Sequence, residues 1–202
     1  MTGLRDRCVV GRVWLDVGAH YGELLARTPE DVTVYAFEPN LALVCRLIGR
    51  HPRYVVLPVA VTETDGCVSF YVTKNDSCSS TLPLDPDGVA GWNTQTGLGV
   101  RALHKVPSIR LDTFLERAGI EHVDYLKVDA QGADLAVVRS AGARLADIDR
   151  IRIEVQIARS PYAGAATKEE MVEYLEARGF RLIGASPQSN GQEQNLDFER
   201  VA

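Results

Sequence analysis

The feature that most constrains the fold is a short apolar run that ends in an acid, a valine and a glycine, from Val13 to Gly18. Such a run is typical of a buried parallel strand. Gly18 must turn the chain at once, and a second glycine, Gly22, allows a ligand to approach the backbone closely. The first amides of the helix that follows lack partners inside it, so they are free to bind a polar group. The stretch therefore predicts a strand, a ligand-binding turn and a helix.

A second apolar run, Val32 to Phe37, ends directly before Glu38, which lies 20 residues beyond Gly18. In nucleotide-binding βαβ units, a carboxylate at about this separation binds the hydroxyls of a ribose. The two strand ends together predict a nucleoside site in which Glu38 binds the sugar, with Pro39 and Asn40 beside it.

The glycine spacing discriminates between nucleoside cofactors. A dinucleotide fold uses G-x-G-x-x-G to hold a pyrophosphate, and here only Gly18 and Gly22 are present. The acid two positions before the first glycine, Asp16, would repel a phosphate and suits a cationic ligand. S-adenosylmethionine (SAM) carries a ribose, a sulfonium and an amino group, so it fits best. A dinucleotide and a purely structural turn are the alternatives.

Composition excludes several other classes of protein. At 202 residues and 46% hydrophobic content, the chain predicts one domain, residues 1–202. A net charge of −5 with mixed signs offers no basic surface for a nucleic acid. Neither a signal peptide nor a run of 18 apolar residues is found, which predicts a protein without a membrane segment. The four cysteines have no C-x-x-C spacing, so we expect reduced thiols and a cytoplasmic location.

The first half of the chain alternates strands and short helices, which predicts a parallel sheet. A short helix over 23–27 follows the glycine turn, and Asn40 is placed to cap a helix over 41–48. The run 54–61 predicts a third strand, the outermost of three because it contains Pro58.

The pattern changes between about 62 and 108. An alternating strand at 67–72 and an extended segment at 100–111 predict a β-hairpin, and the residues between them are rich in Ser, Pro, Gly and Asp. A segment of this kind inside a compact domain is usually a functional loop, so we expect it to cover the site. We call residues 62–108 the insertion.

The second half returns to strands and helices. Capping-box spacing predicts helices after Thr113 and after Thr167, and Gln131-Gly132 is placed to begin another. Predicted strands occupy 123–129, 148–156, 180–184 and 195–201. The last two face each other across a loop without a helix, so they should be antiparallel. The predicted fold is α/β, a Rossmann-like three-layer sandwich with a mostly parallel seven-stranded sheet and a C-terminal antiparallel strand.

Several motifs in this order resemble the FkbM family of SAM-dependent methyltransferases, with the class I methyltransferase fold. They are Asp16 to Gly22, Phe37 to Asn40, Leu111 to Phe114, Leu126 to Asp134 and Asn195 to Phe198. The resemblance implies O-methylation of a hydroxylated small molecule, a natural product or a saccharide. The chain departs from the family pattern in three ways: His20 stands where Asn is frequent, Gln131 stands where Glu is frequent, and the segment before the first strand is short.

Candidate catalytic residues must lie at the carboxyl ends of the strands. Asp129 ends an apolar strand and could bind the amino group of SAM, act as a general base, hold a cation or only cap a helix. Glu154 needs a partner if it is buried, in either a functional or a structural role. His20 is expected to contact the cofactor through its backbone, or else to act as a base. His104 could act from the insertion or lie on the surface.

The predicted cofactor-binding residues come from the tips of the first four strands. They are Asp16, Gly18, Ala19, His20, Tyr21, Gly22, Glu38, Pro39, Asn40, Ala60, Val61 and Asp129. Ser79, Ser80 and Thr81 could meet the cofactor or acceptor from the insertion, or simply be solvated. No metal is predicted, although Asp129 and Glu154 with a third oxygen ligand could hold Mg²⁺.

The sequence thus predicts a SAM-dependent methyltransferase that modifies a small-molecule hydroxyl, binds neither nucleic acid nor membrane, and could form a homodimer. An N-methyltransferase of the same fold is the first alternative. A non-catalytic SAM-fold module that binds a partner is the second. A nicotinamide oxidoreductase is the third, and the missing glycine disfavours it.

Overall fold

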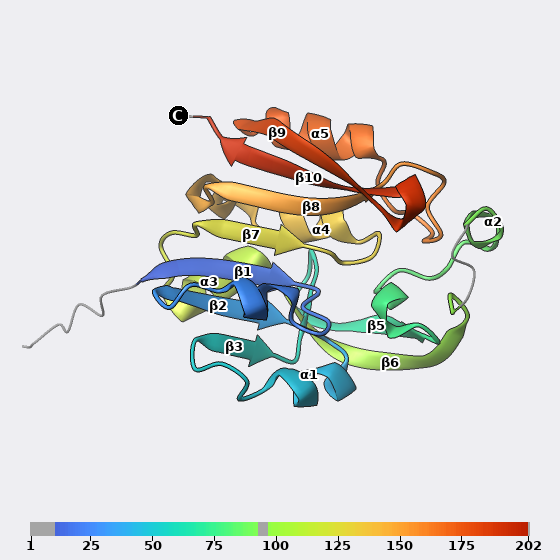
Figure 1. Cartoon of the computed structure of the whole chain (residues 1–202), viewed down its shortest axis with the longest axis horizontal. Helices are drawn as coiled ribbons and strands as arrows, with labels where there is room; N and C mark the ends of the chain where they lie inside the picture. The colour runs from blue at the N-terminus through green and yellow to red at the C-terminus, as the bar shows by residue number, and fades with distance from the viewer. Residues whose placement is uncertain (1–10, 93–96, 202) are drawn as a thin grey trace, which may run out of the picture.

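The computed structural model describes residues 11–92 and 97–201. At its centre is a seven-stranded sheet in the order β3-β2-β1-β7-β8-β10-β9 (Figure 1). Only β10 runs antiparallel to its neighbours, and the other pairs are parallel. The strands are β1 (Arg12–Val17), β2 (Val32–Phe37), β3 (Tyr54–Leu57), β7 (Tyr125–Val128), β8 (Arg150–Gln156), β9 (Phe180–Gln188) and β10 (Glu193–Arg200). The predicted mostly parallel sheet with a reversed C-terminal strand is confirmed.

Helices cover the two faces of the sheet and make three layers (Figure 1). One face is packed by η1 (Glu23–Arg27) and α1 (Leu41–Leu47), the other by α3 (Leu111–Ala118), α4 (Asp134–Arg139), η3 (Gly142–Asp147) and α5 (Lys168–Glu176). Side chains alternate across β1, because Leu15 packs in the core on the α3 side and Trp14 packs on the η1 side. The predicted three-layer sandwich is confirmed.

The predicted third strand, 54–61, is wrong as a single element, because it divides at Pro58. Its first part is β3, which is the edge strand of the large sheet. Its second part is β4 (Ala60–Val61), which pairs in parallel with β6 in a separate three-stranded sheet. Proline has no N–H to donate to a neighbouring strand, so the ladder is interrupted there.

The small sheet has the order β4-β6-β5 and carries the predicted hairpin. Its antiparallel pair is β5 (Gly66–Thr73) with β6 (Val100–Ile109), as expected from the alternating residues. The chain between them contains η2 (Asp76–Cys78) and α2 (Pro86–Ala90). The small sheet and η2 lie beyond the carboxyl ends of β1 and β2 (Figure 1).

Two predicted helix starts are corrected. α3 begins at Leu111, not after Thr113, because its first amides have partners outside the helix: Leu111 N donates to Ser140 Oγ at 3.1 Å and Asp112 N to the Ser140 carbonyl at 3.1 Å. α4 begins at Asp134, not at Gln131, which leaves residues 130–133 as a loop at the site. The capping box of Thr167 and Glu170 at the start of α5 is confirmed.

Two further observations concern membrane-spanning helices and cysteines. Within 11–92 and 97–201, no helix is both long and apolar enough to span a bilayer. Three cysteines, Cys45, Cys67 and Cys78, are free thiols, and Cys8 lies outside the described residues.

Candidate functional site

A cavity of about 330 Å³ lies at the carboxyl ends of β1, β2, β7 and β8 and extends beneath the insertion. This is the edge at which open α/β sheets bind ligands. Many predicted site residues line it: Gly18, His20, Glu38, Pro39, Ala60, Val61, Ser79, Ser80, Thr81, Asp129 and Glu154. Others lie outside the lining: Asp16, Ala19, Tyr21, Gly22, Asn40 and His104. His104 is exposed on β6.

The glycine turn after β1 is packed against the ends of β2 and β7. Gly18 has a φ of +74°. A Cβ atom at this position would lie 1.8 Å from the carbonyl oxygen of Asp129, so no larger residue fits. The amides of Gly18 and Ala19 both donate to the Phe37 carbonyl, at 3.0 and 3.2 Å. These contacts hold the turn in place, and a ligand can approach its backbone closely.

Glu38 is 4% exposed, and backbone amides hold its carboxylate. Its Oε2 accepts from His20 N at 2.9 Å and its Oε1 from Asn40 N at 2.7 Å. Burial raises the pKa of Glu38 above its usual value, although the two amides act in the opposite direction. Carboxylate oxygens have further lone pairs, so Glu38 can still accept from the hydroxyls of a bound sugar.

Asp16 lies beneath the turn and does not reach the cavity wall. Its Oδ2 accepts from the Tyr54 hydroxyl at 2.7 Å, and its Oδ1 is 3.5 Å from Lys127 Nζ. Lys127 is buried, and its Nζ also lies 3.4 Å from Asp129 Oδ2. Burial alone would lower the pKa of Lys127, but the two aspartates raise it above its usual value. The buried ammonium group of Lys127 therefore lies between Asp16, below the turn, and Asp129.

The side chains of Asp129 and Glu154 are brought together by Gln131. Gln131 Nε2 donates to Asp129 Oδ1 at 2.8 Å and to Glu154 Oε2 at 2.9 Å. Its Oε1 accepts from the Tyr162 hydroxyl at 2.6 Å. Because the amide nitrogen occupies the space between those two carboxyl oxygens, they are not placed to share a cation.

The acids of this cluster have different charge states. Burial raises the pKa of Glu154 well above its usual range, and the nearby Asp129 and Glu193 act in the same direction. Burial also raises the pKa of Glu193, which accepts from the Ser189 hydroxyl. Burial among other acids therefore favours the protonated form of Glu154. Asp129 has the cationic partner Lys127 and a side chain that is 31% exposed, so it is the acid suited to carry a charge.

The insertion is joined to both parts of the site. Asp76 Oδ1 lies 3.2 Å from His20 Nε2, and Asp76 Oδ2 accepts from the Tyr21 hydroxyl at 3.1 Å. Ser80 Oγ donates to the Gln131 carbonyl at 2.7 Å. The insertion therefore contacts the glycine turn at one point and the Gln131 loop at another, as expected for a segment that covers the site.

The sequence reasoning did not identify several residues of the site, among them Lys127, Asp76, Tyr162 and Glu193, and it did not identify Gln131 as a bridge. Lys127 and Gln131 lie within the motif from Leu126 to Asp134, and Gln131 also departs from the family pattern there. Tyr162 and Glu193 lie in segments with no motif, and only the folded chain brings them to the cavity.

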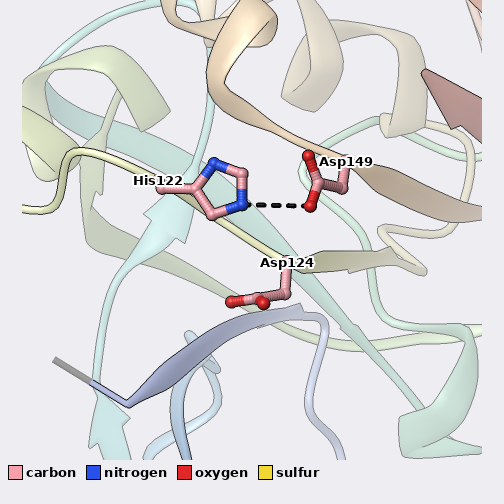
Figure 2. A group of neighbouring side chains, drawn as sticks. All are labelled: His122, Asp124 and Asp149. Atoms are coloured by element: carbon pink, nitrogen blue, oxygen red, sulfur yellow. Dashed lines mark hydrogen bonds and ion pairs between the residues drawn. The ribbon is translucent and has the colours of Figure 1, made fainter. Parts of the chain in front are cut away.

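A second group of side chains, His122, Asp124 and Asp149, lies before β7 and β8, at the opposite end of the strands from the cavity (Figure 2). His122 Nε2 is 3.0 Å from Asp149 Oδ2, and Asp124 Oδ2 accepts from Val13 N at 2.7 Å. The side chains of His122 and Asp149 are 55% and 53% exposed. These contacts describe an ordinary surface ion pair beside a strand-anchoring aspartate.

The sheet order, the glycine turn and the carboxylate at the end of β2 define the class I methyltransferase architecture. The family profile described as the methyltransferase FkbM domain matches residues 16–182. The chain belongs to this family, and it is a SAM-dependent methyltransferase. No curated protein matches the sequence.

Solved structures similar to this chain include several methyltransferases. A TehB-like SAM-dependent methyltransferase from Corynebacterium glutamicum is 12% identical, with 94% of this chain and 80% of that chain covered and a TM-score of 0.44. A SAM-dependent methyltransferase from Aquifex aeolicus is 13% identical, with 95% and 83% covered and a TM-score of 0.47. Magnesium protoporphyrin IX methyltransferase from Synechocystis, with bound SAM, is 9% identical, with 95% and 71% covered and a TM-score of 0.47.

Proposed function

We propose that the protein transfers the methyl group of SAM to a hydroxyl oxygen of an uncharged small molecule. The observation that carries this proposal is the continuity of the cavity. It runs from Glu38 and the glycine turn to a carboxyl cluster in which Asp129 is the group suited to be ionised. The end with Glu38 and the glycine turn suits a nucleoside. The end with Asp129 offers a group that can accept a proton.

The residues of the cofactor end fit the parts of SAM. Glu38 is held so that its free lone pairs can bind the ribose hydroxyls. Val59, Ala60 and Phe70 supply an apolar wall suited to the adenine ring. The backbone of the Gly18 turn is left for the methionine part, next to the carbonyl of Asp129.

SAM, when bound, supplies a methyl carbon activated by its sulfonium. As the acceptor oxygen bonds to that carbon, the carbon–sulfur bond breaks, and the hydroxyl proton must leave. An aliphatic hydroxyl has a high pKa, so a general base contributes about 10²–10⁴-fold to the rate. Asp129 is assigned this role, because burial among other acids disfavours the charged form that Glu154 would need to receive the proton.

The charge of the cavity wall supports an acceptor without negative charge. Among the described lining residues there is no lysine or arginine. The lining includes five carboxyl groups, from Glu38, Asp76, Asp129, Glu154 and Glu193. A phosphate or carboxylate on the acceptor would be repelled by the charged carboxylates, and the described lining offers it no lysine or arginine.

The test is a screen with SAM carrying a deuterated methyl group against sugars and hydroxylated metabolites, each paired with its phosphorylated analogue, with and without EDTA. We expect a mass increase of one labelled methyl group on uncharged acceptors, and little on the phosphorylated partners. Transfer to nitrogen in a matched amine panel would support the N-methyltransferase alternative. If S-adenosylhomocysteine fails to bind at micromolar concentrations, the proposed function is wrong.

A further inference from the structure

Gln131 has a backbone conformation that non-glycine residues rarely adopt, with a φ of +54°. Contacts from two other segments hold it. The carboxylate of Asp134, at the start of α4, accepts from the amides of Ala130 and Gly132 at 2.7 and 2.9 Å. Ser80 Oγ, from the insertion, donates to the Gln131 carbonyl at 2.7 Å. Such a conformation persists only where the surroundings determine it, and it is frequent at functional sites.

This conformation directs the side chain of Gln131 between two acids. Nε2 has two N–H groups, and it lies 2.8 Å from Asp129 Oδ1 and 2.9 Å from Glu154 Oε2. Oε1 lies 2.6 Å from the hydroxyl of Tyr162, which is 3% exposed. The reversed amide would put its oxygen against Oδ1 of Asp129, which as a carboxylate has no proton to donate, so this contact favours the orientation with Nε2 towards Asp129.

We propose that Gln131 is a positioning residue for methyl transfer: its amide joins Asp129 to Glu154 and holds Asp129, whose other oxygen faces Lys127, as the carboxylate that receives the acceptor's proton. The inference rests on the proposed function, in which Asp129 is the base. Hydrogen bonds donated to a carboxylate favour its charged form. A rigid donor also fixes the carboxylate relative to the cofactor turn, and small displacements of a catalytic group are costly.

The other charged and titratable groups near Asp129 limit how far the loss of the Gln131 side chain can change the titration of Asp129. Lys127 Nζ lies 3.4 Å from Oδ2, so each oxygen of Asp129 has its own donor. Four further acids interact electrostatically with Asp129: Asp16 from β1, Glu154 from β8, Asp134 from α4 and Glu193 from β10. His20 also lines the cavity. Because Lys127 stays in place, loss of the Gln131 donors should shift the titration of Asp129 without abolishing its charge at neutral pH.

The experiment follows Asp129 itself and needs no acceptor. Protein labelled with ¹³C at the aspartate carboxyl carbon is titrated by NMR, and Asp129→Asn identifies the Asp129 signal. Gln131→Met keeps an unbranched side chain of similar length and removes both N–H donors. We expect the titration midpoint of Asp129 to rise by roughly one pH unit. Tyr162→Phe removes the contact that orients the amide, so it should shift the midpoint the same way by less. His122→Ala, at the far end of the strands, is the matched control.

An unchanged midpoint in folded Gln131→Met and Tyr162→Phe proteins overturns the proposal, and Tyr162→Phe alone decides if the methionine variant does not fold. Binding of S-adenosylhomocysteine is measured on the same samples. If it is absent while the midpoint moves, the proposed function fails and the effect of Gln131 on Asp129 stands. If S-adenosylhomocysteine binds normally and the midpoint does not move, the effect of Gln131 on Asp129 is refuted and the proposed function stands. With an acceptor in hand, the acidic limb of the kcat profile should move with the midpoint.

Discussion

The two ends of the cavity are built in different ways. At the end that we propose for the cofactor, the glycine turn and Glu38 are held by backbone amides that all lie within the stretch from Gly18 to Asn40. At the acceptor end, Asp129, Gln131 and Glu154 are held by one another's side chains and by Tyr162, which comes from a separate loop. The first end is a property of local backbone geometry. The second exists only once distant segments have packed.

This difference separates binding from chemistry. Backbone anchoring tolerates changes in side chains elsewhere, so the cofactor end should keep its affinity when the acceptor end is altered. A side-chain network in a buried site is sensitive to the loss of any member, because each remaining polar group then lacks a partner. Variants at either end of the cavity therefore test the contrast between the two ends.

Asp129→Asn should have the largest effect and should be confined to the acceptor end. Loss of the base lowers kcat by about 10²–10⁴-fold. Affinity for S-adenosylhomocysteine, measured by calorimetry, should change by less than roughly threefold, since Glu38 and the turn are intact. If affinity falls as much as kcat, Asp129 binds the cofactor instead, and the contrast between the two ends is lost.

Asp134→Asn tests the buried acid that holds the Gln131 loop. Burial raises the pKa of Asp134 to about 7, against an ordinary value of 3.8. Its protonated form is therefore the one that the fold favours. The stabilisation that Asp134 contributes is complete below pH 3.8 and is lost as the pH rises towards 7, by up to roughly 4 kcal/mol.

The measurement is the free energy of unfolding of both proteins across this range, and the quantity of interest is their difference. Other groups titrate alike in the two proteins and cancel. The free energy of unfolding of the wild type should fall relative to that of the asparagine variant from about pH 4 to pH 7. Above about pH 8 the difference between them should be constant. A difference that is independent of pH would show that Asp134 is ionised throughout.

Glu38→Ala should affect the cofactor end alone. Removing a carboxylate that binds ribose hydroxyls costs about 1.5–3 kcal/mol, so affinity for S-adenosylhomocysteine should fall roughly 10- to 150-fold. At saturating SAM, kcat should stay within a few fold of the wild type. Glu38→Gln is the matched variant and should lose less, because it keeps one oxygen acceptor. Unchanged affinity in the alanine variant contradicts the assignment of Glu38.

Asp76→Ala should give the smallest effect, because it removes only the contacts that join the insertion to His20 and Tyr21. The side chain of Asp76 is 30% exposed, and partly exposed pairs contribute about 0–1 kcal/mol. The KM for SAM should rise about two- to fivefold. Asp87→Ala, also in the insertion but paired with Arg159 on the surface, should leave it unchanged. An equal effect in both variants would mean that the insertion does not act through this contact.

The sequence allowed the cofactor end to be predicted because its determinants are local. The strand 32–37, the capping residue Asn40 and the position of Glu38 beside the glycine turn were all correct. Each depends on a few consecutive residues whose backbone preferences point the same way. The reversed last strand was also predictable, since two strands without an intervening helix must be antiparallel.

The acceptor end was not predictable to the same degree, because its contacts span long stretches of sequence. Tyr162 reaches Gln131 across 31 residues, and its hydroxyl reaches the Cys78 carbonyl across 84. The same cause explains one of the two helix starts that were wrong, since Ser140 provides the partners that let α3 begin early. Local propensity contains no information about such partners.

The position of β10 has a consequence for how the chain assembles. Although it is the last strand in the sequence, it lies between β8 and β9, and its first residue, Glu193, pairs with Gln156 at the end of β8. β9 emerges from the ribosome before β10, its partner among the described strands. The edge of β8 thus stays open until β10 has been synthesised, so the glycine turn can form well before Glu193 reaches the cavity.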